Sequence, residues 1–292
     1  MSRRIALIVN PSAGGGRAAR ALPEAEAALR EHGLPFRVEI TRDLDHARAL
    51  ARAAAQAGEV TATLGGDGLV GCVAGVLRET PGAVLGLVPG GRGNDLARVL
   101  GIPPDPREAC AVLAHGVERG LDVGEAEGRA FVGIASLGFD SDANRIANEA
   151  PSRLGNLVYA YGALRALAAW RPARFELTLD DETRTFSGYS VAAANSKAYG
   201  GGMYMAPDAE LDDGLLDVVI TEDLPKLRFL ANLPKVFKGT HVREPEVHVL
   251  RSREVRVVSN RPFVVYADGD PIGATPITIR CVPRALRVLV PG

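Results

Sequence analysis

The feature that most constrains the fold of this chain is residues 63–69, Thr-Leu-Gly-Gly-Asp-Gly-Leu. An apolar run precedes them and apolar residues at helical spacing follow, which predicts a strand, a glycine-rich turn and a helix start. Glycine lets a backbone approach a ligand closely, and N–H groups at a helix N-terminus attract phosphate. Asp67 would repel phosphate unless it holds a divalent cation, directly or through water. The alternative is a plain turn in which Asp67 caps the helix.

A second stretch has the same organisation. Residues 84–88 predict another strand, and the glycine-rich residues 89–98 follow it, with Asn94 or Asp95 expected to cap the next helix. Successive parallel strands end at one edge of a sheet, where open α/β sheets bind ligands. Neither turn has the lysine of a P-loop or the spacing of a dinucleotide fingerprint. Together the two turns predict one phosphate-binding edge.

The first half of the chain repeats this alternation of strand and helix to about residue 118. Strands are expected at residues 4–9, which end at Asn10, and at residues 36–40, which end at Thr41. This pattern predicts a doubly wound parallel sheet. Beyond about residue 120, short β-type segments separated by turn signals predict a mainly antiparallel domain.

We therefore expect an α/β nucleotide-binding domain at residues 1–120 and a mainly β substrate domain at residues 121–292. We expect a cleft between the two domains. The last strand either stays in the second domain or returns to the first.

Composition narrows the class of protein. The chain has 292 residues, enough for two domains, and its net charge of -1 argues against general nucleic-acid binding. Cys72, Cys110 and Cys281 form neither a zinc pattern nor a disulfide framework, which favours a reducing cytosol. Cys72 is interpreted as a small buried helix residue rather than a nucleophile. No signal peptide and no apolar run of roughly 18 residues is apparent. A cytoplasmic protein is expected.

Two helical stretches admit more than one interpretation. Residues 154–170 are apolar on most sides, which favours a packed helix over a lipid port. Residues 224–242 contain no acid but carry Lys226, Arg228, Lys235 and Lys238. They predict either a helix on an anionic membrane surface or an amphipathic helix packed on the second domain with a solvated basic edge.

Several motifs in order along nearly the whole chain carry a family resemblance. They are Asn10-Pro11 with Gly14, Thr41 with His46, both glycine-rich loops, and residues 138–140, 200–203, 213–218 and 268–270. Each motif is weak alone. Together they resemble the diacylglycerol kinase catalytic-domain family, which comprises bacterial lipid kinases related to sphingosine and ceramide kinases and distantly to NAD kinases.

The resemblance implies ATP- and Mg²⁺-dependent phosphorylation of a hydroxyl on a diacylglycerol-like lipid. It also implies a nucleotide site made of Asn10, Gly14, Thr41, Gly65, Gly66, Asp67, Gly68, Gly91, Arg92 and Asn94.

The same resemblance assigns roles to further acids. Asp67 and Asp95 would hold the catalytic Mg²⁺ network. Asp270 would accept the proton of the acceptor hydroxyl, with Asp268 nearby. A second, structural Mg²⁺ would be bound by Asp213 with the backbone carbonyls of Glu210 and Leu215. By residue type alone, the acids beyond residue 200 are turn residues.

Five positions depart from the family pattern. Leu69 and Arg92 each stand where the family usually has Thr, Gly71-Cys72 replaces a frequent Asn-Glu, and Asp270 replaces Glu. Arg92 could offset its lost hydroxyl by a charged hydrogen bond to phosphate, whereas Leu69 cannot. The shorter Asp270 has less reach for the attacking oxygen.

Three functions remain open from the sequence. The first is a lipid kinase in peripheral contact with the inner, anionic membrane surface, with a homodimer allowed. The second is a kinase of a soluble hydroxyl compound, as in NAD kinases. The third is a nucleotide- or lipid-binding protein without turnover, for which Leu69, Gly71, Cys72 and Arg92 are the evidence.

Overall fold

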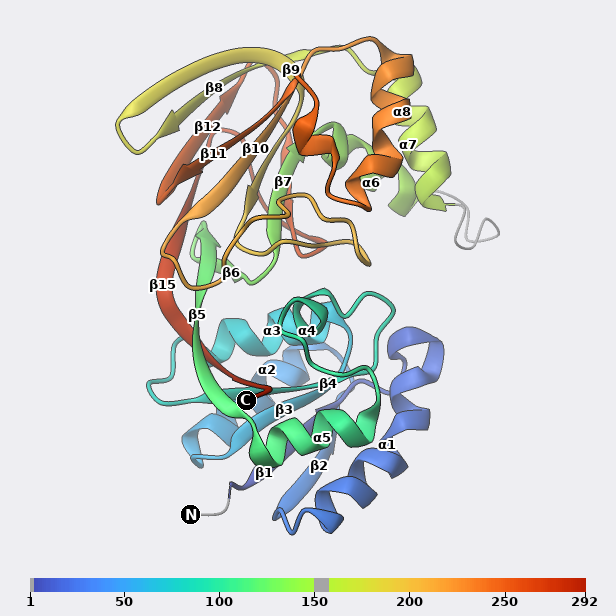
Figure 1. The fold of residues 1–292 in the computed structure, drawn as a ribbon, viewed down its shortest axis with the longest axis vertical. Coiled ribbons are helices and arrows are strands. Elements are labelled where there is room, and N and C mark those ends of the chain that lie inside the picture. The colour runs from blue at the N-terminus through green and yellow to red at the C-terminus, as the bar shows by residue number, and fades with distance from the viewer. Residues whose placement is uncertain (1–2, 150–157) are drawn as a thin grey trace.

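The computed structural model, which describes residues 3–149 and 158–292, begins with alternating strands and helices (Figure 1). The strands pair in parallel in the order β2-β1-β3-β4. The strands are β1 (Ile5–Val9), β2 (Phe36–Ile40), β3 (Val60–Gly65) and β4 (Val84–Pro89). The helices are α1 (Ala13–Glu31), α2 (Leu44–Gln56), α3 (Asp67–Leu77), α4 (Asp95–Val99) and α5 (Pro106–His115).

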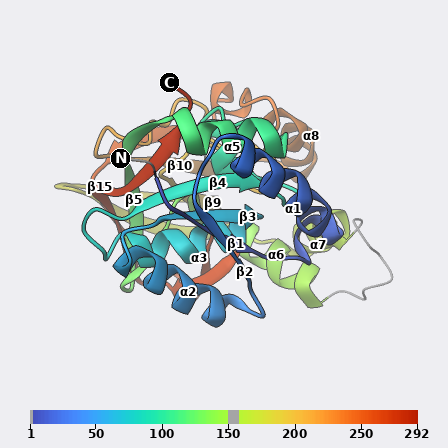
Figure 2. The same ribbon diagram turned by 90° about the horizontal axis from the view of Figure 1, so that it is seen from below.

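Helices cover both faces of this parallel sheet. Figure 2 shows α1 and α5 on one face and α2 and α3 on the other. Strands β1, β3 and β4 are buried along their whole length, as apolar runs between two helical layers must be. The inward face of α2 is made of Ala47, Ala51 and Ala54, whose small side chains allow the helix to pack closely. This layering leaves the carboxyl ends of the strands as the open edge.

The second part of the chain is mainly antiparallel. Three helices, α6 (Phe139–Glu149), α7 (Val158–Ala169) and α8 (Lys226–Val236), lie along one side of its strands (Figure 1). A short 3₁₀ helix spans His241–Arg243. The strands are β5 (Val117–Ala126), β6 (Arg129–Phe131), β7 (Ile134–Gly138), β8 (Ala173–Leu179), β9 (Glu182–Ala194), β10 (Leu216–Glu222), β11 (Val247–Ser252), β12 (Glu254–Ser259), β13 (Val264–Ala267), β14 (Asp270–Ala274) and β15 (Ile277–Val290).

An aromatic cluster joins the helices of this second part to its sheet. The ring of Tyr189 on β9 stacks on Trp170 and on Phe229 of α8, with centroids 5.7 and 4.1 Å apart. Phe139, at the start of α6, meets Phe229 edge-on at 4.7 Å. Stacked and edge-on ring pairs add about 0.5–1.5 kcal/mol each beyond the burial of their area. They hold α6 and α8 against β9.

The last strand connects the two parts. β15 pairs antiparallel with β5 over most of its length, and near its end Arg287 and Val288 pair in parallel with Val84 and Leu85 of β4. The final residues of the chain therefore extend the N-terminal sheet. An α/β fold with a parallel N-terminal sheet and antiparallel C-terminal strands is confirmed. The division at residue 120 stays a prediction, because β5 and β15 run through both parts.

The stretch at residues 154–170 is helical from Val158 onward, while residues 154–157 lie outside the described residues. Ala166, Leu167 and Trp170 are buried in the second core, so one face of this helix packs as expected. Tyr161 and Leu164 face solvent instead. The helix therefore has one packed face and one exposed apolar face.

Asp122 holds β5, β15 and the loop before β10 together. It is 1% exposed. Its Oδ2 accepts a hydrogen bond from the backbone N–H of Gly214 at 2.6 Å, and its Oδ1 accepts one from Arg284 N–H at 2.8 Å. Arg284 lies in a bulge of β15, where the register with β5 shifts. One carboxylate thus supports the bulge and the loop at once.

Replacement of this carboxylate should destabilise the protein. Asp122→Ala leaves two backbone N–H groups without their acceptor, so the free energy of unfolding should fall by about 2–4 kcal/mol. Urea denaturation measures it. The control is Asp181→Ala, in the exposed turn between β8 and β9, which should change stability by less than about 0.5 kcal/mol. Equal stability of the two variants would contradict the role of Asp122.

Candidate active site

The loops that follow β1, β3 and β4 meet at the open edge of the parallel sheet. The backbone N–H of Asn10 donates to the carbonyl of Leu64 at 3.0 Å, and that of Gly90 donates to Gly65 at 2.8 Å. Thr41 N–H, after β2, donates to the carbonyl of Val9 at 2.8 Å. The structure therefore brings together the residues that the sequence places in the nucleotide site.

Glycine is required where these loops touch. A Cβ on Gly91 would lie 2.4 Å from the Cα of Gly66, and a Cβ on Gly14 would lie 2.6 Å from the carbonyl oxygen of Gly90. Heavy atoms that are not bonded cannot come so close, so larger residues would force the loops apart. Gly14 also has a φ of 61°, which only glycine adopts readily.

Asp67 joins the two glycine-rich loops. Its Oδ1 accepts a hydrogen bond from Asp95 N–H at 2.6 Å, and its Oδ2 accepts one from Asn94 N–H at 2.8 Å. The N-cap of α3 itself is Gly66, which makes no side-chain cap. The alternative that Asp67 caps its own helix is therefore wrong: it supplies the hydrogen bonds at the start of α4.

Of the two residues expected to cap α4, Asn94 is the N-cap residue. Its side chain, however, does not cap the helix. Its Oδ1 accepts from Gly91 N–H at 2.8 Å and closes the turn, with a φ of 52° at Asn94. The acceptor for the helix N–H groups comes from a residue 27 positions earlier, Asp67.

Asp95 bridges the two parts of the chain. The residue is 7% exposed. Its Oδ1 accepts from Arg98 at 2.8 Å, and its Oδ2 accepts from the backbone N–H of Gly201 at 2.7 Å. Gly201 lies in a turn of three glycines with positive φ, one of the family motifs to which the sequence assigned no role. That role is to meet the second glycine-rich loop from across the cleft.

Asp268 faces the first glycine-rich loop from the turn between β13 and β14. Its carboxylate accepts backbone hydrogen bonds from Val132 at 2.8 Å, Gly133 at 3.0 Å and Ile134 at 3.1 Å. Burial nevertheless raises the pKa of Asp268 to about 6, and the charge of Asp67 adds to that rise. Asp268 is thus a half-buried residue whose carboxylate is held in place by three backbone N–H groups, close to Asp67.

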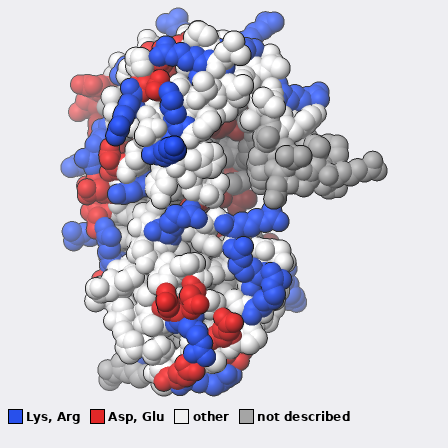
Figure 3. Space-filling model, turned by 45° about the vertical axis from the view of Figure 1, so that its right-hand side comes forward, with Lys and Arg blue, Asp and Glu red and all other residues white. Residues whose placement is uncertain are grey.

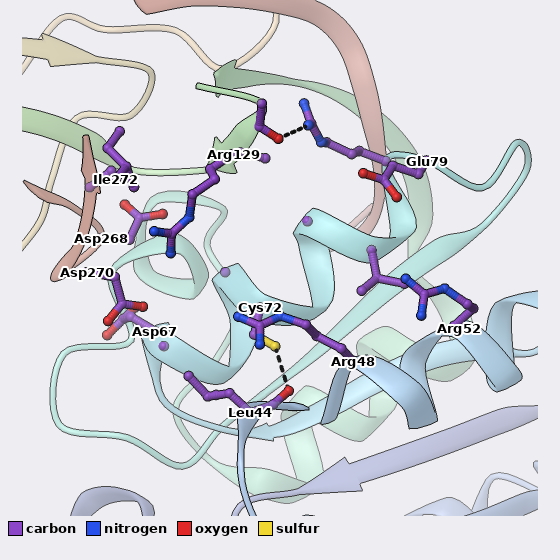
Figure 4. Close-up of a pocket in the computed structure, with 18 residues that line it drawn as sticks. Leu44, Arg48, Arg52, Asp67, Cys72, Glu79, Arg129, Asp268, Asp270 and Ile272 are labelled. Atoms are coloured by element: carbon purple, nitrogen blue, oxygen red, sulfur yellow. Dashed lines mark hydrogen bonds between the residues drawn. The ribbon is translucent and has the colours of Figure 1, made fainter. Parts of the chain in front are cut away.

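A cavity of about 220 Å³ lies between the two parts, and Figure 4 shows how its side chains are arranged. The acids Asp67, Asp268 and Asp270 lie at one end, and Asp270 is exposed there. Arg129 from β6 points toward these acids, and Arg48 reaches across from α2 (Figure 4). Sequence reasoning missed both arginines, because no motif marks Arg129 and Arg48 is one of many arginines on a helix.

Small residues of α3 form one wall of this cavity. They are Gly68, Gly71, Cys72 and Gly75. Cys72 is half-buried, its Sγ donates to the carbonyl of Leu44 at 3.3 Å, and burial raises the pKa of its thiol. These facts support the interpretation of Cys72 as a small helix residue. At the two positions where the family often has Asn-Glu, the smaller Gly71 and Cys72 line the cavity.

The two remaining departures from the family pattern, Leu69 and Arg92, differ in their exposure to solvent. Leu69 is 3% exposed and packs over Gly65, so that a Cβ on Gly65 would lie 2.7 Å from its Cδ2. A leucine here adds to the first core, and the hydroxyl of the family threonine has no counterpart. Arg92 is exposed on the second glycine-rich loop.

The carboxylates of the cleft suit a cation held through water. Burial, and next the charge of Asp95, raise the pKa of Asp67, so negative charge is in excess here. The carboxylate of Asp67 accepts backbone hydrogen bonds from Asn94, Asp95 and its own N–H, which leaves about one of its four lone-pair positions for a metal-bound water. Within residues 3–149 and 158–292, no group of three or more His, Cys, Asp or Glu side chains is arranged to ligate a metal directly. Asp67 therefore fits a water-mediated Mg²⁺, whereas Asp95 already pairs with Arg98.

The second metal site expected from the sequence fits less well. The Oδ1 of Asp213 accepts from Leu215 N–H at 3.0 Å, and its Oδ2 contacts the guanidinium of Arg251. Burial, with the charges of Asp208 and Glu210, raises the pKa of neighbouring Asp217 to about 6. Arg251 occupies the carboxylate that a metal would need. The site at Asp213, Glu210 and Leu215 stays a prediction that this geometry does not favour.

Comparison with known proteins decides the family. A family model described as the diacylglycerol kinase catalytic domain matches residues 4–126, and one described as a YegS C-terminal NAD kinase beta sandwich-like domain matches residues 133–290. The protein named diacylglycerol kinase from Mycobacterium tuberculosis (strain ATCC 25618 / H37Rv) is 34% identical over 297 residues, 99% of this chain and 95% of that protein. The chain belongs to the diacylglycerol kinase catalytic-domain family. The resemblance carried by its motifs is confirmed.

Other members of the diacylglycerol kinase family agree. "Probable lipid kinase YegS-like" from Stenotrophomonas maltophilia is 30% identical over 301 residues, 98% of this chain and 96% of that protein. A solved diacylglycerol kinase structure from Bacillus anthracis str. Sterne has a TM-score of 0.76 at 19% identity, over 99% of this chain and 97% of that one. A second structure from that organism reaches 0.83 at 22% identity, with the same coverage. At these identities the structures bear on the fold alone.

Asp140 is a half-buried acid that lacks a full set of hydrogen-bond partners. It follows β7 at the start of α6, and its Oδ2 is buried without a hydrogen-bond partner. Burial raises the pKa of Asp140 to about 6. Burial, and next the charge of Asp140, raise the pKa of Tyr199. An ionised Asp140 therefore weakens the fold.

The pH dependence of stability should show this group. The pKa of Asp140 in the folded protein exceeds the usual value near 4. Its contribution to the free energy of unfolding is therefore full at acid pH and is lost as the pH rises through about 6. Asp140→Asn cannot ionise. Relative to wild type, its free energy of unfolding should rise by about 1–2 kcal/mol between about pH 5 and about pH 8. Denaturant melts at both pH values measure it, and a difference independent of pH would contradict the assignment.

Proposed function

We propose that this protein is an ATP- and Mg²⁺-dependent kinase that phosphorylates a hydroxyl of a diacylglycerol-like lipid. The observation that carries this proposal is the contact of two glycine-rich loops with three buried or half-buried acids at a cleft between the two parts. Phosphoryl transfer depends on positioning and charge neutralisation rather than on covalent chemistry. Relatives named diacylglycerol kinase support the acceptor class.

The donor side is assigned to the glycine-rich loops. Backbone N–H groups at Gly66 and Gly68 would face the nucleotide phosphates, aided by the positive end of α3. Arg92, exposed on the second loop, would add a charged hydrogen bond. Asp67 would hold Mg²⁺ through water, and the cation would neutralise charge on the phosphates.

The acceptor side is assigned to the turn between β13 and β14. Asp270 is exposed to the cavity and would take the proton of the attacking hydroxyl. Asp268 is less suited to that role, because three backbone N–H groups occupy its carboxylate. Asp268 instead fixes the turn that presents Asp270. The shorter side chain of Asp270 requires the hydroxyl, or one bridging water, to come closer than a glutamate would.

Contact with a membrane follows from a lipid acceptor. Among the described helices, none has the length and apolar character to cross a bilayer. We therefore propose peripheral contact with the bilayer that contains the acceptor. A homodimer stays a prediction.

Transfer of radiolabel from ATP to a total lipid extract, with a soluble metabolite pool alongside, tests the kinase. Wild type should label lipid. Asp67→Asn and Asp270→Asn should each lower turnover by at least about a hundredfold, the scale of a lost general base. Asp181→Asn is the control and should keep full activity. Label only in the soluble pool, no label at all, or wild-type turnover by Asp67→Asn would refute the proposal.

Arg92 gives a separate test of the donor site. Arg92→Ala should weaken ATP binding by about 1.5–3 kcal/mol, the range for a hydrogen bond to a charged group. Arg92→Thr, which restores the family hydroxyl, should lose less. Calorimetry gives both affinities, with Arg174→Ala on the exposed side of β8 as the control. Unchanged ATP affinity in both Arg92 variants would remove this residue from the site.

A further inference from the structure

Helix α8 is apolar on two opposite faces. Its inner face packs Phe229, which is buried, against the aromatic cluster, with Leu233 half-buried beside it. Its outer face consists of Leu227, Leu230, Ala231 and Pro234, all exposed and spaced i, i+3, i+4 and i+7. Residues at that spacing form one stripe along a helix. Leu227 is 83% exposed and Leu230 is 38% exposed, so the stripe faces solvent.

Helix α7, which contacts the start of α8, also carries exposed apolar side chains. The two helices are joined by Lys226, whose Nζ donates to the carbonyl of Ala168 at 2.8 Å. Nine large hydrophobic side chains are exposed in the described part of the chain, and five belong to this surface. We call these five the α7–α8 patch: Tyr161, Leu164, Leu227, Leu230 and Phe237. Clusters of this kind mark interaction sites on soluble proteins, whereas isolated exposed residues do not.

The positive charge around the α7–α8 patch is smaller than the sequence predicts, because acidic side chains pair with two of its basic residues. Arg228 pairs with Glu246, and Lys235 pairs with Glu244 at 2.7 Å. Both acids lie just beyond the acid-free residues 224–242 and fold back onto α8. Among the described residues, Lys238 makes no ion pair. Figure 3 shows the outcome on this side of the molecule, where separate Lys and Arg groups surround uncharged surface.

We propose that the α7–α8 patch inserts into the headgroup boundary of a lipid bilayer, and that apolar insertion, not charge, supplies most of the binding. A helix with an exposed apolar stripe and basic residues at its flanks is the pattern of an interfacial helix. Lys238 can extend along the patch with its charge at the phosphates. A lipid surface matches both features. The inference rests on the proposed function only in that a lipid acceptor supplies the reason to dock.

The patch is also connected to the cleft. At the end of α8, the carbonyl of Val236 accepts a hydrogen bond from Tyr204 N–H at 2.9 Å. Tyr204 follows the glycine turn whose Gly201 N–H is bound by Asp95 at 2.7 Å. Docking through α8 therefore brings the Gly201 side of the cleft close to the bilayer, where a lipid hydroxyl would enter.

Vesicle sedimentation tests the insertion without any need for turnover. Wild type should bind phosphatidylcholine vesicles with or without anionic lipid, and should stay bound at about 0.5 M salt, where charges are screened within a few Å. Leu227→Gln with Leu230→Gln should lower the partition coefficient at least about tenfold, because a buried leucine is worth roughly that factor or more. Val117→Gln, 51% exposed on β5, is the matched control and should bind like wild type.

Three outcomes would overturn the proposal. One is equal binding by wild type and the double leucine variant at an unchanged melting temperature. Another is binding that requires anionic lipid and is lost in salt or in Lys235→Glu with Lys238→Glu, which would assign it to charge. The last is self-association of wild type without vesicle binding, abolished by the leucine changes. Failure to phosphorylate lipid would refute the kinase proposal but would leave these results standing.

Discussion

The site depends on one carboxylate, that of Asp67. Its two oxygens accept the backbone N–H groups of Asn94 and Asp95, and so tie the loop after β3 to the loop after β4. With that contact made, Asp95 is placed to receive Gly201 from the second part of the chain. Because backbone N–H groups at the start of a helix need acceptors, the same bonds also stabilise the short helix α4. A single side chain thus organises the loops, a helix start and the closure of the cleft.

This arrangement concentrates negative charge. Asp67, Asp95 and Asp268 are close enough for their charges to act on one another, and burial raises the pKa of Asp67 and of Asp268. Backbone hydrogen bonds offset part of that penalty and hold the acids in place. A site of this kind favours a divalent cation and phosphate groups entering together, since the charge of each compensates that of the other. The acids that stabilise the loops are in this way the ones suited to the chemistry.

Rigidity in the second part supports the membrane-facing surface. Stacking of Tyr189 with Trp170 and Phe229 fixes α8 against the sheet, so its outer stripe cannot turn inward. The burial of Phe229 on one side therefore exposes Leu227 on the other. The exposed stripe follows from packing, and a bilayer is the environment in which it lowers the free energy.

The sequence by itself determined the alternation of strand and helix, the glycine turns at one sheet edge and the family, because periodicity, turn residues and ordered motifs are local properties. It placed Asn10, Thr41, Gly66 and Gly91 at that edge, where the structure has them. The tertiary structure decided the partners of the charged groups. Asp67 binds N–H groups 27 and 28 residues away, and Asp213 meets Arg251 38 residues away. Glu244 and Glu246 neutralise a helix that looked purely basic. A charge interacts with whatever lies within a few Å in space, and distance along the chain does not reveal that neighbour.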